Sequence, residues 1–135
     1  MPYLALKLST IPPAPLARQL AITLTELTVT LLRKRRELTA VTVESLPRGQ
    51  WFIGAAAVES QGKAAFHLEI VVTEGTNSDA EKADFVAASY AALESALGAV
   101  ALTSYVVIRD VDGRAWGYGG MSQAARKEVR PVAIV

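Results

Sequence analysis

The sequence predicts an α+β fold in which a β-α-β unit occurs twice, so that a four-stranded mixed sheet is backed by two helices. Three observations predict it: an internal repeat, strand-like alternation at the start of each half, and a helix with clear start and end signals. At 135 residues, the chain has the size of one compact domain with a full hydrophobic core. We expect residues 1–135 to form a single domain, with repeats at about 2–60 and 64–122 and a short C-terminal tail.

The repeat is visible in three parts of the chain. Residues 38–43 recur as 102–107, and residues 51–55 recur as 116–120. Self-similarity over this length indicates a repeated supersecondary unit. A shift of 66 residues also aligns four apolar positions of each half, namely Leu20, Leu24, Leu27 and Leu31 with Val86, Tyr90, Leu93 and Leu97.

A strand is predicted at the start of each half. In the first, over about Tyr3–Thr10, leucines at every second position alternate with other side chains, which is the period of a half-buried strand. Its counterpart in the second half spans about Ala65–Thr73.

The first helix follows from two conflicting patterns. Residues 22–30 alternate like a strand and are rich in β-branched side chains. However, apolar residues between positions 17 and 31 keep the three-four spacing of a helix, and Pro13 and Pro15 are typical of a helix start. The repeat decides in favour of a helix, because the corresponding segment of the second half is an unambiguous helix.

That second helix has signals at both ends. Residues 78–81, Ser-Asp-Ala-Glu, form a capping box, an alanine-rich stretch follows at 83–97, and Gly98 ends it. A right-handed crossover makes the strands of each unit parallel and places both helices on one sheet face. The other face is then covered only if it packs on another subunit, so we expect an oligomer.

Composition excludes several function classes. The absence of cysteine excludes disulfides and thiolate metal sites, and the only histidine, His67, cannot form a multi-histidine site. We therefore expect no metal site. Lys and Arg (14) balance Asp and Glu (13), which argues against nucleic-acid binding. The basic run 33–36 is interpreted as the solvated last turn of the first helix.

The expected compartment is the cytoplasm. The N-terminus lacks the charged and apolar regions of a signal peptide. The apolar run 20–32 is interrupted by Glu26 and is too short to cross a bilayer, so we expect no membrane partner. Hydrophobic residues make up 51% of the chain, which favours an apolar subunit interface.

Two motifs resemble the tautomerase superfamily. Pro2 directly follows Met1 and opens a strand, and residues 110–120 (DVDGRAWGYGG) resemble the strand-to-hairpin signature of that superfamily. Residues 50–55 (QWFIGA) are a more divergent version. The arrangement is similar to fused 4-oxalocrotonate tautomerases, cis-3-chloroacrylic acid dehalogenase and malonate semialdehyde decarboxylase. The resemblance implies a homotrimer of doubled units, a small-molecule substrate and active sites at subunit boundaries.

Pro2 is the candidate catalytic residue. Removal of Met1 exposes its secondary amine; such amines titrate at about 8, and burial moves this value toward neutral. The neutral amine can take a proton from one atom of a substrate and return it to another. If Met1 is retained, Pro2 is an amide and this chemistry is lost. The 66-residue shift places Leu68 opposite Pro2, so each chain has one such base.

The resemblance implies an aromatic residue above the proline, at Trp51 or Trp116; for each of them, packing at the subunit interface is the alternative interpretation. Arg114 and Arg109, like Arg48, flank the hairpins and are candidates for an anion site. Arg114 is preferred because it lies two residues before Trp116, although a solvated or interface arginine is the alternative for each.

The carboxylate-binding arginines of the superfamily have no counterpart here. The loops at 10–13 and 73–77 contain none, and the second-strand position falls on Thr42 and Val106. Bidentate arginine contacts are hard to replace, so a dicarboxylate substrate is disfavoured. Elsewhere, Lys7 is assigned equally to the pocket or to an interface ion pair, and His67 is assigned a structural role.

The sequence thus predicts a cofactor-independent keto-enol tautomerase that uses Pro2 as general base and acid on a small 2-oxo acid or related enol. One alternative is a hydratase, decarboxylase or dehalogenase acting on a three-carbon acid. Another is a non-catalytic trimeric protein with the same fold.

Overall fold

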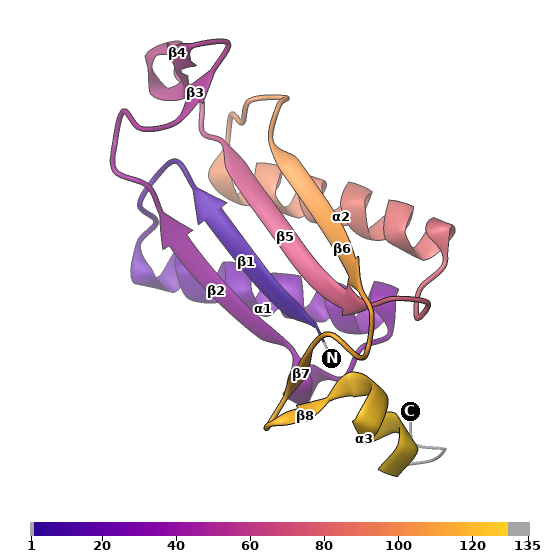
Figure 1. Cartoon of the computed structure of the whole chain (residues 1–135). Helices are drawn as coiled ribbons and strands as arrows, with labels where there is room; N and C mark the ends of the chain where they lie inside the picture. The colour runs from indigo at the N-terminus through magenta and orange to yellow at the C-terminus, as the bar shows by residue number, and fades with distance from the viewer. Residues whose placement is uncertain (1, 130–135) are drawn as a thin grey trace.

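The computed structural model describes residues 2–129, which form two β-α-β units in succession (Figure 1). The first half consists of β1 (Tyr3–Leu8), α1 (Ala14–Leu32), the 3-10 turn η1 (Arg36–Leu38), β2 (Ala40–Ser45), and a hairpin of β3 (Phe52–Ile53) and β4 (Ala56–Ala57). The 3-10 turn η2 (Val58–Gln61) leads into the second half, which consists of β5 (Phe66–Thr73), α2 (Asp79–Leu97), β6 (Tyr105–Val111), a hairpin of β7 (Gly117–Tyr118) and β8 (Met121–Ser122), and α3 (Gln123–Val129). Helix α3 was not predicted, and the tail from Arg130 lies outside the described residues.

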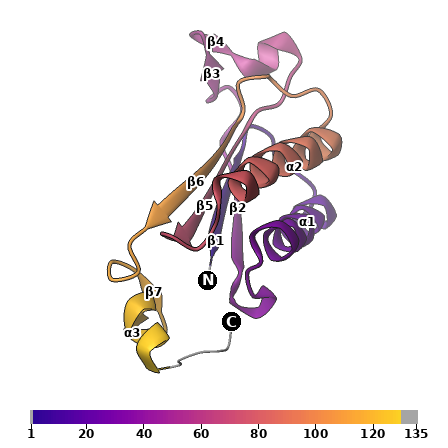
Figure 2. The same ribbon diagram turned by 90° about the vertical axis from the view of Figure 1, so that its right-hand side faces the viewer.

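The four long strands form one sheet in the order β2-β1-β5-β6. Strands β1 and β2 are parallel, as are β5 and β6, whereas the central pair β1 and β5 is antiparallel. Both long helices cover the same face of this sheet, as Figure 2 shows from the side. The predicted fold class, a mixed four-stranded sheet backed by two helices, is therefore confirmed.

Helix α1 forms in spite of its β-branched residues because one side of it is buried. Its buried positions recur every four residues, at Leu20, Leu24, Thr28 and Leu32. The buried hydroxyl of Thr28 donates to the Leu24 carbonyl at 2.8 Å, which satisfies a polar group that burial would otherwise penalise. The helix ends at Arg33, whose φ of 58° is left-handed.

Helix α2 begins and ends where the sequence predicts. The Ser78 hydroxyl accepts from the Glu81 amide at 3.1 Å, and the Glu81 carboxylate accepts from the Ser78 amide at 2.9 Å. This reciprocal pair is the predicted capping box. Gly98, with a φ of 86°, ends the helix.

The two halves correspond with offsets that differ from the predicted shift of 66 residues. The buried positions of α2 are Phe85, Ser89 and Leu93, each 65 residues after a buried position of α1. Val86, which the predicted shift aligned with Leu20, is 38% exposed. The predicted shift was wrong by one residue because leucine and alanine occupy both sides of these helices, so apolar spacing alone leaves the register open.

The strand register gives the counterpart of Pro2. Tyr3 pairs with Ala40 in the first half, and His67 pairs with Tyr105 in the second. Since Tyr105 lies 65 residues after Ala40, His67 corresponds to Tyr3, and Phe66, not Leu68, corresponds to Pro2. The second half therefore has a buried phenylalanine at the position of the proline.

The core lies between the helices and one sheet face. It contains alternate residues of the two central strands, namely Leu4, Leu6 and Leu8 with Phe66, Leu68, Ile70 and Val72. The residues between them point to the opposite face, which no described element covers (Figure 2). None of the described helices combines the length and apolar character that a membrane crossing requires.

Candidate active site

One end of the sheet gathers the starts of β1 and β2, the ends of β5 and β6, the α1–β2 connection and the β5–α2 connection. We call it the proline end. Since β1 and β5 are antiparallel, with Tyr3 opposite Val71, the first residues of β1 lie beside the last residues of β5. Figures 1 and 2 both show the chain start near the ends of β5 and β6 and near the hairpin β7–β8.

Pro2 is buried at this end. Its carbonyl oxygen accepts a hydrogen bond from the Ala40 amide at 3.3 Å, which continues the pairing of β1 with β2. Continuing the β1–β5 register by one residue places Pro2 opposite Val72, another buried residue. The proline thus lies among apolar groups, in the setting that disfavours a protonated amine. Met1 lies outside the described residues.

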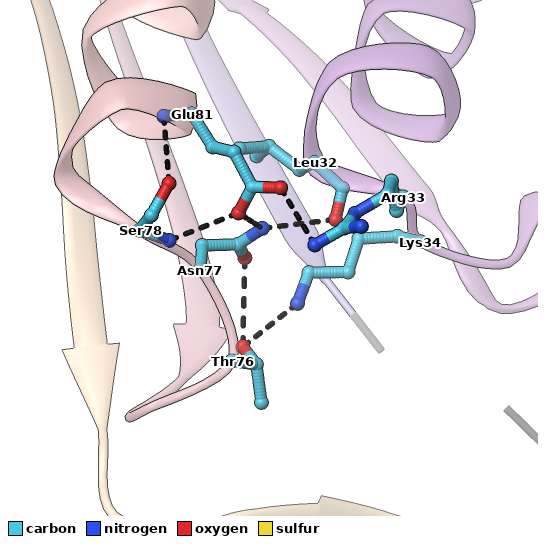
Figure 3. Close-up of polar contacts among 7 residues, drawn as sticks. All are labelled: Leu32, Arg33, Lys34, Thr76, Asn77, Ser78 and Glu81. Atoms are coloured by element: carbon cyan, nitrogen blue, oxygen red, sulfur yellow. Dashed lines mark hydrogen bonds and ion pairs between the residues drawn. The ribbon is translucent and has the colours of Figure 1, made fainter.

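A polar network surrounds the loop that follows β5 (Figure 3). The Lys34 ammonium donates to the Thr76 hydroxyl at 2.8 Å, and this hydroxyl donates to the Thr73 carbonyl at 2.6 Å. The Asn77 side chain donates to the Leu32 carbonyl at 3.0 Å. These bonds connect the end of α1 with the end of β5, so they fix Lys34 at the proline end.

Lys34 differs from its basic neighbours because it has no carboxylate partner among the described residues. Arg33 pairs with Glu81 at 2.7 Å, Arg35 with Glu37 at 2.6 Å, and Arg36 pairs with Glu26. These pairs neutralise the rest of the basic run. The run lies after the end of α1 and not in its last turn, so that part of the prediction was wrong. Lys34 alone in this run remains available for an external anion.

Burial lowers the pKa of the Lys34 ammonium below its usual value, although the carboxylates of Glu81 and Asp110 oppose the shift. The pKa of Glu81 is itself lowered, first by the hydrogen bond from the Ser78 amide and then by the bond from Asn77. Asp110 pairs with Lys82 at 2.6 Å. Lys34 is therefore a partly desolvated cation, which attracts an anion more strongly than a solvated one does.

Trp116 extends this network toward the hairpin. Its indole Nε1 donates to the Thr73 hydroxyl at 3.2 Å, while the Thr73 carbonyl accepts from Thr76. Lys34, Thr76, Thr73 and Trp116 thus form one continuous chain of contacts, which we call the Lys34–Trp116 network. A shallow hollow of about 290 Å³ lies against the indole. It is lined by Arg114, Ala115, Trp116, Gly117, Gly120, Met121 and Ser122.

Arg114 lies beside Trp116, as the sequence suggests, but it is engaged with a carboxylate. Its guanidinium pairs with Asp112 at 2.8 Å, and its side chain is 82% exposed. Hydrogen bonds from the Arg114 side chain and amide lower the pKa of Asp112 to about 2. Arg114 therefore remains charged and paired at neutral pH, at the rim of the hollow.

The other predicted binding residues lie elsewhere. Trp51 lies on the hairpin β3–β4 at the opposite end of the sheet, where it packs against Val58, Ala65 and Ala101. Arg109 lies on the open sheet face and pairs with Glu69 at 2.8 Å. The described chain thus brings Trp116 and Arg114 to the proline end. Arg109 shares a strand row with Val71 and Tyr3, beside Pro2, but lies on the open sheet face, and Trp51 lies at the opposite end of the sheet.

The remaining basic candidates are outside this site. Arg48 lies near the β3–β4 hairpin and pairs with Glu59 at 3.5 Å. His67 lies on the open sheet face, where Lys7 is its cross-strand neighbour and its ring tilts toward Tyr105 at 6.3 Å. Within residues 2–129, no group of histidine, cysteine and acidic side chains has the arrangement of a metal site.

Sequence reasoning missed Lys34, Thr73 and Thr76. Lys34 was grouped with three arginines in a charge run, which hid the fact that its side chain turns inward. The repeat does not mark Lys34 either, because the residues 65 positions after the four members of the basic run are Gly98, Ala99, Val100 and Ala101, none of which is basic.

No protein-family model matches the sequence, and comparison with curated proteins finds no significant match. Solved structures do match. A fused 4-OT, described as a wild-type symmetric trimer, has a TM-score of 0.80 at 17% identity and covers 92% of this chain and 98% of its own. A native fused 4-OT crystal structure has a TM-score of 0.81 at 22% identity, covering 91% of this chain and 97% of its own.

A macrophage migration inhibitory factor-like protein from Entamoeba histolytica matches with a TM-score of 0.74 at 16% identity, covering 90% of this chain and 97% of its own. The chain therefore has the tautomerase superfamily fold, as the two sequence motifs predict. These similarities extend over nearly the full length of both chains.

Proposed function

We propose that this protein is a cofactor-independent keto-enol tautomerase of the tautomerase superfamily, acting on a small 2-oxo acid that carries a single carboxylate. The observation that carries the proposal is the Lys34–Trp116 network, which places a partly desolvated cation and an indole at the end of the sheet where Pro2 is buried. After removal of Met1, the same place holds a secondary amine.

The reaction needs only one proton to move between two substrate atoms. The neutral nitrogen of Pro2 takes the proton from the enol hydroxyl, and the electron pair of that O–H bond forms the keto carbonyl. The resulting ammonium returns a proton to the neighbouring carbon, where the enol double bond places its electrons. Pro2 ends neutral, so one residue acts as base and then as acid.

Lys34 supplies the positive charge that binds the substrate carboxylate. It takes the place of the superfamily arginines that the sequence lacks. A single ammonium is a point charge rather than a bidentate partner, so it fits one carboxylate better than a rigid dicarboxylate. Its partial burial strengthens the ion pair that forms when substrate binds.

Trp116 supplies an apolar wall for the rest of the substrate, because its ring lines the hollow at the hairpin while its N–H is occupied by Thr73. Arg114, at the rim of that hollow, adds a second positive charge that Asp112 largely neutralises. This arrangement favours an aryl or alkenyl substituent over a second carboxylate.

We also propose that the protein is a homotrimer. Its sheet has one face that no described helix covers, and two of the fused 4-OT structures that it matches are described as trimers. Several exposed apolar and aromatic side chains lie on that face, including Tyr3 and Tyr105. Burial of such a face is a common driving force for association.

The proposal is tested by the ketonisation of phenylenolpyruvate, followed by absorbance, with the wild-type protein and Pro2→Ala. General acid–base catalysis contributes about 10²–10⁴-fold, so Pro2→Ala is expected to lower kcat/KM by at least the smaller factor. The matched control is Pro47→Ala, which changes an exposed loop proline away from the proline end. Undiminished activity in Pro2→Ala, or no wild-type activity above the buffer rate, would overturn the proposal.

A further inference from the structure

Two hairpins with the same backbone course are held in place by different contacts. In both, the residue that follows the hairpin donates its amide to the tryptophan carbonyl at 2.9 Å: Val58 to Trp51 in the first, and Gln123 to Trp116 in the second. In the first hairpin, the side chains of Trp51 and Ile53 pack against a buried apolar cluster. Apolar burial is enough to hold that hairpin in place.

Within residues 2–129, the second hairpin contributes no side chain to either apolar cluster. We call residues 116–123 the Trp116 hairpin. Tyr118 occupies the position of Ile53, 65 residues later, and it is not part of either described core cluster. What holds Tyr118 is Arg126 of α3. The guanidinium donates to the Tyr118 carbonyl at 2.6 Å and lies 3.9 Å from the centre of the Tyr118 ring.

The turn of this hairpin leaves room for the Arg126 guanidinium. Gly119 has a φ of 61°, and a Cβ there would lie 3.2 Å from the Arg126 guanidinium nitrogen. Its counterpart Gly54, with a φ of 59°, has open space in the same direction. The residue corresponding to Arg126 is Gln61, so the first half lacks both the cation and the close approach.

We infer that Arg126 is a positioning residue that holds the Trp116 hairpin against α3, and thereby sets how tightly substrate is bound. The inference rests on the proposed function for its catalytic part. Arg126 does not line the hollow, and its backbone and ring contacts are with Tyr118, two residues after Trp116. Its influence on substrate therefore passes through the position of Trp116.

Replacing Arg126 is expected to have a small net effect on folding. Its Nε is buried and has no hydrogen-bond partner within the described chain, and an unsatisfied donor costs stability. Arg126→Met removes this donor together with the favourable contacts to Tyr118, so the two effects oppose each other. Arg126→Lys keeps the charge and a donor for the carbonyl but loses the planar stacking group.

The test uses two measurements on the intact protein, with Gln61→Met as the matched control. The first is acrylamide quenching of Trp116 fluorescence in a Trp51→Phe background. Arg126→Met is expected to raise the quenching constant about twofold, because a freer hairpin exposes the indole on the nanosecond timescale. The second is the kinetics of phenylenolpyruvate ketonisation.

In the kinetics, Arg126→Met is expected to raise KM about tenfold, the combined effect of one hydrogen bond and one cation–π contact, while kcat falls less than twofold. Arg126→Lys is expected to recover part of the loss, and Gln61→Met is expected to match the parent. Unchanged quenching, or a fall in kcat without a rise in KM, would overturn the inference. If the wild-type protein is inactive, the proposed function fails, and the quenching experiment alone decides the role of Arg126 in holding the hairpin.

Discussion

The Lys34 ammonium lies 2.8 Å from the Thr76 hydroxyl, across the gap between the end of α1 and the loop after β5. This contact joins two segments 42 residues apart in the sequence. It holds a cation where burial lowers the pKa of the ammonium and where no described carboxylate pairs with it. Its consequences for stability and for binding have opposite signs, so a single substitution of Lys34 tests both.

Replacing Lys34 with methionine is expected to weaken binding without loss of stability. The folded pKa is below the unfolded value, so between the two values the unfolded chain binds more protons and stability rises with pH. Below that window the folded protein carries the full cost of a desolvated charge. Lys34→Met removes this cost and also the bond to Thr76. Its free energy of unfolding at pH 7, from urea titration, should therefore equal or exceed that of wild type.

The same Lys34→Met variant should raise KM for phenylenolpyruvate about tenfold or more, since a charge-assisted hydrogen bond contributes about 1.5–3 kcal/mol. Lys34→Arg should retain most of the binding. Lys63→Met, at an exposed position, serves as the control for loss of one positive charge. Equal KM values for Lys34→Met and Lys63→Met would rule out Lys34 as the carboxylate partner.

Trp116 and Thr73 should behave as a coupled pair. Trp116→Phe and Thr73→Val each remove the same hydrogen bond, whose net contribution is about 1 kcal/mol. The double variant should therefore lose no more catalytic efficiency than the more severe of the single variants, in a double-mutant cycle on kcat/KM. If the losses in kcat/KM of the two single variants add up in the double variant, the hydrogen bond does not position the indole.

Replacing Ser89 with alanine is expected to stabilise the fold by about 1 kcal/mol. The buried Ser89 hydroxyl has no hydrogen-bond partner among the described residues, so its desolvation is not compensated, and the substitution removes that cost. Thermal unfolding at fixed protein concentration measures the effect. Thr28→Ala provides the contrast. Its hydroxyl is equally buried but bonded to Leu24, so its loss, together with that of a methyl group, should destabilise the protein.

A charge on the open sheet face should dissociate the oligomer. Val107 lies on β6 beside Glu69, on the face that the helices leave uncovered. Val107→Asp places a carboxylate next to another one in the proposed interface, which is costly when both are desolvated. Native mass spectrometry should show trimers for wild type and monomers for the variant. Ile22→Glu, on the exposed side of α1, should remain trimeric; dissociation of both variants would indicate general destabilisation instead.

The fold was predictable from the sequence because its signals are local and repeated. The capping box at Ser78 and Glu81 and the alternation of Leu4, Leu6 and Leu8 each specify one element. The repeat then extends these assignments to α1, although its β-branched residues favour a strand. The exact offset between the halves was not predictable, because it depends on which side of each helix is buried.

The site was only partly predictable. Pro2 and Trp116 belong to recognisable motifs, but the partners of Lys34 and Trp116 come from a loop that no motif marks. Thr73 and Thr76 acquire their role only through the antiparallel pairing of β1 with β5, which brings the end of one strand to the start of another. Likewise, the paired state of Arg109 and Arg114 depends on cross-strand and turn neighbours, Glu69 and Asp112.

The central claim is that Pro2 presents a reactive N-terminal amine. The compound 2-oxo-3-pentynoate carries a conjugated alkyne, to which an amine adds, whereas an amide does not. The decisive measurement is the intact mass of the protein before and after incubation with 2-oxo-3-pentynoate, with the site located by peptide mapping. We predict a chain that begins at Pro2 and gains one adduct on Pro2. Retained Met1, or an adduct on any other residue with Pro2 unmodified, would contradict the account.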